Sequence, residues 1–147
     1  ASNVTLVTGA SGSYNVNDSG STYIAYVWAP IEGYSKFGNY VGNGLADGTF
    51  VYCGFKPKYV MIKRTDSTSD WVILDVARDT YNVMNKDLNA DSTAAEGVNS
   101  PSIDFLSNGF KLRQATTDPN VSGGNYIFAA FAEYPFGGSG ISQARAR

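Results

Sequence analysis

The chain has no histidine, and its single cysteine is Cys53. Without histidine, the Ser-His-Asp and Cys-His arrangements that activate nucleophiles cannot form, and the commonest metal-ligating side chain is missing. One cysteine cannot make an intrachain disulfide or a cysteine-based zinc site. Because Cys53 lies in the apolar run 50–53, we expect it to be a buried thiol. We therefore expect a protein that is not an enzyme, with no cofactor and no metal site.

Charge is also scarce. Charged residues make up 16% of the chain, the net charge is −2 and the pI is about 4.9. Nucleic-acid binding needs a clustered basic face, whereas the closest approaches here are the short stretches Lys56-Pro57-Lys58 and Lys63-Arg64. No apolar run approaches the length of a membrane span. We expect neither a nucleic-acid partner nor membrane insertion.

Glycine and aromatic residues are plentiful, with 16 glycines and 14% aromatics. They fall into short apolar runs separated by turn signals such as Asp66-Ser67 and Asn108-Gly109, and no stretch shows sustained helical periodicity. The pattern predicts an all-β protein, a jelly-roll-like β-sandwich with little or no helix and one long polar loop at Asp79–Ser102. The expected strands are Val4–Thr8, Thr22–Ala29, Thr49–Cys53, Lys58–Thr65, Asp70–Val76, Ile103–Leu106, Gly109–Arg113 and Asn125–Ala132.

One segment occurs twice. Tyr23 and Tyr126 are equivalent, which sets the copies 103 positions apart (126 − 23 = 103), too long a period for a solenoid. Each copy is a polar Gly/Ser turn that leads into one apolar strand. We therefore expect residues 1–33 to be the C-terminal part of a preceding β module that repeats 120–136. Residues 34–136 would be a complete module and 137–147 a flexible tail.

Both copies of this strand are apolar on both faces, so each needs a covering layer. The covering layer would be a neighbouring module or another chain. This predicts a homo-oligomer, with an interface that includes the aromatic residues of the two copies: Tyr23, Tyr26, Trp28, Phe128 and Phe131.

The polar loop and the aromatic residues beside turns are the best candidates for ligand binding, because long loops often carry function and aromatic faces stack on sugar rings. The candidates are Trp71, Arg78, Tyr81, Asn85 and Asp91, with Arg78 also expected to pair with Asp75. Alternate oxygen-bearing residues from Asn85 to Asp91 resemble the start of a calcium loop, but Ala90 stands where such a loop has glycine. A solvated polar loop is the favoured interpretation.

Several motifs together resemble a domain that recurs at the C-terminus of tail-fibre and related virion structural proteins of tailed bacteriophages, especially marine and cyanobacterial ones. They are Glu32-Gly33-Tyr34-Ser35-Lys36-Phe37-Gly38-Asn39-Tyr40-Val41-Gly42-Asn43-Gly44, Gly54-Phe55-Lys56-Pro57, Ile62-Lys63-Arg64-Thr65-Asp66, Asp104-Phe105-Leu106-Ser107-Asn108-Gly109-Phe110-Lys111 and Tyr126-Ile127-Phe128-Ala129-Ala130-Phe131-Ala132-Glu133.

The resemblance implies a virion-exposed β module near the end of a fibre or appendage, on the extracellular face of the particle. It also implies assembly as a trimer with other virion proteins as partners, and carries over no catalytic residue. Three functions stay open: binding of a host-surface glycan, a purely structural role as a capsid decoration protein or filament subunit, and a depolymerase. The missing histidine weighs against the depolymerase.

Overall fold

The computed structural model describes residues 17, 19–115 and 117–136, without the side chains of residues 99 and 100. Within these residues the protein is all-β and contains no helix. No helix in this part of the chain is therefore long and apolar enough to cross a membrane. The strands are β1 (Ser35–Val41), β2 (Phe50–Tyr52), β3 (Pro57–Arg64), β4 (Val72–Asp75), β5 (Met84–Asn89), β6 (Gly97–Leu106), β7 (Gly109–Leu112) and β8 (Asn125–Ala132).

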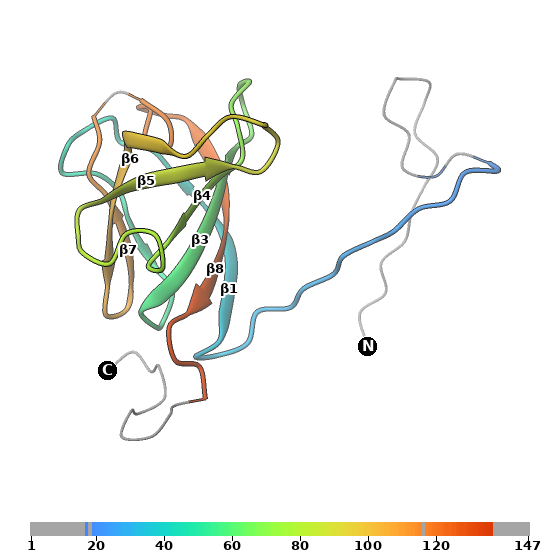
Figure 1. Ribbon diagram of the computed structural model, residues 1–147, viewed down its shortest axis with the longest axis horizontal. Coiled ribbons are helices and arrows are strands. Elements are labelled where there is room, and N and C mark those ends of the chain that lie inside the picture. The colour runs from blue at the N-terminus through green and yellow to red at the C-terminus, as the bar shows by residue number, and fades with distance from the viewer. Residues whose placement is uncertain (1–16, 18, 116, 137–147) are drawn as a thin grey trace.

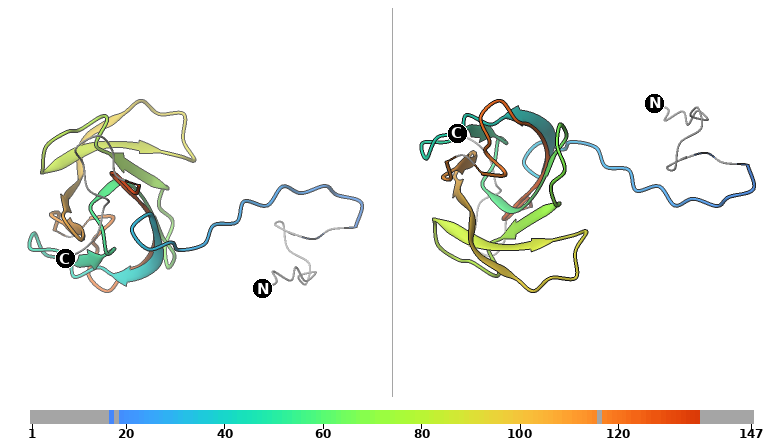
Figure 2. Two further views of the ribbon diagram at one scale, coloured as in Figure 1. Left: turned by 90° about the horizontal axis from the view of Figure 1, so that it is seen from below. Right: turned by 90° about the horizontal axis from the view of Figure 1, so that it is seen from above.

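The strands form one sheet in the order β1-β8-β3-β4-β5-β6-β7-β2, and every pairing is antiparallel. The sheet curls until its two edge strands, β1 and β2, face each other, which gives a sandwich-like, nearly closed barrel (Figures 1 and 2). Near this seam, the Thr49 hydroxyl donates a hydrogen bond of 2.8 Å to the Val41 carbonyl. β8 lies between β1 and β3 in this sheet and pairs with both of them.

The core lies inside the curled sheet. β8 shows how alternation builds it: Tyr126, Phe128, Ala130 and Ala132 are buried, whereas Ile127 and Phe131 face outward. Aromatic rings dominate the interior, with the rings of Tyr40 and Tyr126 stacked at 5.0 Å and Phe110 packed edge-on to Phe128 at 5.4 Å. Cys53 is buried, as its apolar surroundings predicted.

Two turn predictions are confirmed. The 66–69 segment connects the paired strands β3 and β4, and Ser107-Asn108 connects β6 to β7. The Arg78–Asp75 ion pair is present as well, at 2.7 Å from Nε to Oδ2.

Two predictions are wrong. The expected loop Asp79–Ser102 contains β5 and the first part of β6, because β5 pairs with β4 on one edge and with the first part of β6 on the other, and a polar sequence does not reveal these backbone partners. Residues 22–29, expected to be a strand, are extended but belong to no ladder, because none of the strands that the structure describes pairs with them. The expected strand Val4–Thr8 and the tail 137–147 lie outside the described residues.

Candidate functional site

The outer surface of β1, β8 and β3 carries a group of neighbouring apolar side chains. The register aligns Phe37 of β1 with Ala129 of β8 and Ala129 with Met61 of β3. Phe131 packs edge-on against both Phe37 and Tyr59, each at 5.9 Å between ring centroids. A groove of about 320 Å³ opens here, lined by Trp28, Phe37, Tyr59, Met61, Ala129 and Phe131. We call these six residues the outer apolar face.

A second apolar feature lies beside it. Residues 21–30, which we call the arm, run away from the barrel as an extended chain (Figures 1 and 2). The side chains of Ile24, Tyr26 and Val27 are 82%, 74% and 71% exposed. The arm meets the barrel at its C-terminal end, where the Trp28 ring stacks on Phe37 at 6.5 Å.

The structure separates the five residues predicted for an oligomer interface. Tyr23, Tyr26 and Trp28 lie on the exposed arm, and Phe131 belongs to the outer apolar face. The prediction for Phe128 is wrong, because this side chain is buried inside the barrel. Phe128 and Phe131 differ by an odd number of positions on one strand, so they point to opposite sides of the sheet.

The residues predicted to bind a ligand do not form a single cluster. Trp71 and Asp91 meet at one end of the β4–β5 pair, where the Trp71 amide donates to the Asp91 carboxylate at 2.9 Å. Arg78 and Asn85 lie around the turn after β4, near Asp75 and Asp79. Tyr81 projects from the β4–β5 connection and is 81% exposed.

The calcium alternative is not supported by the geometry. Asn85, Asp87 and Asn89 lie along β5, and a strand spreads alternate residues in a line instead of wrapping them around a cation. Within the described part of the chain, no group of three or more acidic, Cys or His residues could hold a metal ion. Asp87 is 7% exposed, and burial raises the pKa of its carboxyl.

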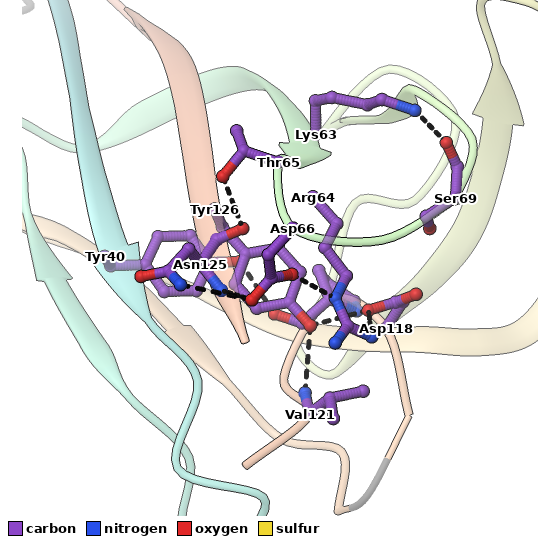
Figure 3. A network of polar contacts seen from close by, with 11 residues as sticks. Tyr40, Lys63, Arg64, Thr65, Asp66, Ser69, Asp118, Val121, Asn125 and Tyr126 are labelled. Atoms are coloured by element: carbon purple, nitrogen blue, oxygen red, sulfur yellow. Dashed lines mark hydrogen bonds and ion pairs between the residues drawn. The ribbon is translucent and has the colours of Figure 1, made fainter. Parts of the chain in front are cut away.

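Sequence reasoning missed a polar network at the start of β8 (Figure 3). The Tyr126 hydroxyl donates to Asp118 at 2.6 Å and accepts from the Val121 amide at 3.0 Å. Arg64 donates to Asp66 at 2.6 Å, and Asp66 accepts two hydrogen bonds from Asn125. Burial, with the hydrogen bond to Asp118, raises the pKa of Tyr126 to about 12. No pattern in the sequence brings these residues together, because they come from two segments, 64–66 and 118–126, that are more than 50 positions apart.

This network connects the end of β3 to the segment before β8, and we call it the clamp. The Arg64 guanidinium, together with hydrogen bonds from Asn125, holds the pKa of Asp66 at about 2, far below neutrality. Tyr126 stays protonated and Asp66 ionised, so neither group is poised to exchange a proton. The network instead ties the 118–125 segment to the end of β3.

A buried asparagine continues this clamp. Asn120 is fully buried, and the two N–H groups of its side-chain amide are shared among three acceptors 2.8–3.0 Å from the nitrogen: Asn43 Oδ1, the Leu45 carbonyl and the Gln114 carbonyl. Its Oδ1 accepts from the Asn43 amide at 3.1 Å. One side chain therefore joins the β1–β2 connection to the segment before β8.

The fold and its surfaces define the class of this protein: an all-β, barrel-like module with prominent exposed apolar side chains. The chain belongs to the family described as Domain of unknown function (DUF7483), whose model matches residues 1–135, arm and barrel together. No curated protein and no solved structure matches the chain.

Proposed function

We propose that this protein is a non-enzymatic structural module that works by assembly, as the C-terminal part of a phage tail fibre or a similar appendage of the virion. The observation that carries the assembly role is the outer apolar face. The virion setting, on the extracellular face of the particle and with other virion proteins as partners, rests on the resemblance of the motifs described above.

The chemistry of the outer apolar face fits a protein partner. Of its six residues, only Trp28 and Tyr59 carry a polar group. A sugar site needs several convergent hydrogen-bonding groups, whereas a subunit interface has an aromatic, water-excluding centre. A contiguous exposed apolar patch of this kind marks an interaction site. A second copy of the chain, in a trimer, is the partner that we propose.

Sedimentation velocity tests the assembly. We expect the wild-type chain to form a trimer and Phe37→Lys to shift it to monomer, because a charge would be buried at the interface. Val98→Lys is the matched control, since Val98 is 60% exposed on β6, which β4 and β5 separate from β3 in the sheet, and should leave the trimer intact. A wild-type chain that stays monomeric at all concentrations would refute the assembly role.

A second candidate function is attachment to a host-surface glycan. The observation in its favour is Tyr81, which is strongly exposed on a turn that Asn82 holds rigidly: the Asn82 side chain donates to the Phe105 carbonyl and accepts from the Phe105 amide, both at 2.9 Å. A rigid exposed aromatic ring suits stacking on a sugar.

Glycan arrays test this function. Specific retention that is lost in Tyr81→Ala or Trp71→Ala, and kept in Tyr52→Ala on β2, would support it. Absence of retention in an assembled wild-type protein would favour the alternative role of a capsid decoration protein or filament subunit.

A further inference from the structure

The arm carries the sequence of a strand but forms none here. We propose that residues 22–29 are the eighth strand of a second β module of this fold, which stands directly before β1 of the module described above. The arm would fill, in that module, the position that β8 fills in this one.

The turn ahead of the arm matches the turn ahead of β8. The 103-position offset pairs Asn17 with Asn120, Ser19 with Ser122 and Gly20 with Gly123. Both glycines adopt left-handed backbone conformations, with φ of +83° and +74°. Neither has a heavy atom within 4 Å of where a Cβ would lie, so the conformation and not crowding selects glycine at both positions.

The two faces of the arm also match those of β8. The offset places Tyr23, Ala25 and Val27 at the positions of the buried residues of β8, and Ile24, Tyr26 and Trp28 at the positions of its outward residues. Tyr126 is 1% exposed in β8, whereas Tyr23 is 46% exposed on the arm. The same apolar pattern is thus buried in one copy and open to water in the other.

The position of β8 identifies the partner. β8 lies between β1 and β3 and pairs with both along its length. In this chain those two strands already hold β8, so the arm needs the equivalents of β1 and β3 in another module. Exposed strands of this apolar character tend to acquire such a partner.

The connection between the arm and β1 indicates that the two modules are neighbours. Ile31 and Ser35 exchange backbone hydrogen bonds of 3.1 and 2.9 Å, so the chain passes from the end of the arm into β1 through one tight turn. Trp28 lies against Phe37 at this junction. The outer apolar face is therefore next to the place where the second module would lie.

The inner residues of the arm predict a difference between the two cores. Ala25 replaces the bulky Phe128, and Val27 replaces the small Ala130. Since cores keep their total volume, the second module should carry a larger side chain opposite Ala25, at the positions equivalent to Tyr40 and Phe110, which contact Phe128 here.

Hydrogen exchange of the arm amides tests the inference. A two-module polypeptide would join residues 34–118 directly to residues 16–147, so that the arm follows a module that has no β8 of its own. We expect amides 22–29 to exchange about 100-fold more slowly, or slower still, than in the chain of 147 residues. Val27→Pro in the same polypeptide should abolish this protection, because proline cannot donate to a ladder.

A second version of the two-module polypeptide tests whether the inner side chains of the arm fail to fit the core of a module that is built from residues 34–118. Ala25→Phe with Val27→Ala restores the inner residues of β8, so protection in this version alone would still support the inference. Equally fast exchange in both versions would overturn it. Protection that is already present in the 147-residue chain and rises with its concentration would overturn it too, since the partner would then be a second copy. Loss of the trimer in sedimentation would leave this result unchanged, so the two proposals fail separately.

Discussion

At the scale of single residues, buried polar groups hold the connections of this barrel in place. Asn120 is the clearest case: its side chain is fully buried, its amide N–H groups face three acceptors, and its Oδ1 accepts a fourth hydrogen bond. We expect Asn120→Ala to lower the free energy of unfolding by about 2–4 kcal/mol, because backbone groups are left without partners. Urea denaturation measures the loss. Asn39→Ala, at an exposed position on β1, is the control and should change stability by less than about 0.5 kcal/mol.

Asp66 should make the stability of the protein depend on pH. Its hydrogen bond from Arg64, with those from Asn125, lowers its folded-state pKa to about 2 from an ordinary value of 3.8. A lowered carboxyl pKa contributes stability that is present above pH 3.8 and lost as the pH falls through 2. We expect the melting temperature to fall between pH 4 and pH 2, and Asp66→Asn to make that fall shallower. An unchanged slope in Asp66→Asn would contradict the role of the clamp.

At the scale of elements, β8 serves two surfaces at once. Phe128 is in the core and Phe131 is on the outer apolar face, and they make a matched pair of truncations. We expect Phe128→Ala to lower the free energy of unfolding of the monomer by about 3–5 kcal/mol, and Phe131→Ala by clearly less. Assembly should show the reverse order, with Phe131→Ala the more damaging. Equal costs in denaturant unfolding would contradict the assignment of faces.

The sheet elements also show how far sequence reasoning reaches. Asn125–Ala132 was predicted with the bounds that β8 has, and β3 was predicted to within one residue at each end, because both are apolar runs between turn signals. β5 was missed, because its polar sequence forms a strand only through its neighbours β4 and β6. Local apolar patterns in a sequence indicate which residues are buried, so a strand that pairs with its neighbours without deep burial is hard to recognise from its sequence.

The outer apolar face was predicted only in part for a similar reason. Trp28 and Phe131 stood out because they belong to the repeated segment. Phe37, Tyr59 and Met61 were missed, because they come from β1 and β3, which are far apart in the chain and meet only through β8. The outer apolar face is formed by three strands together, so the sequence of no single strand predicts it.

At the scale of the whole molecule, a single continuous sheet should unfold as one unit. The two tryptophans separate the barrel from the arm, since Trp71 lies beside β4 and Trp28 lies on the arm. In Trp28→Phe, we expect Trp71 fluorescence and far-ultraviolet circular dichroism to report the same urea midpoint. Two separate midpoints would show that the two halves of the sheet fold independently.

The sequence by itself determined the secondary-structure class, the positions of the most apolar strands and the likeness between the arm and β8. These are local properties, because period-two alternation, turn chemistry and composition act over a few neighbouring residues. Only the tertiary structure decided which of the two equivalent segments became a strand, which side of β8 faces the core, and which residues meet at the outer face. Those outcomes depend on backbone partners and contacts supplied by distant segments: β8 has β1 and β3 beside it, whereas no strand of the described part of the chain pairs with the arm.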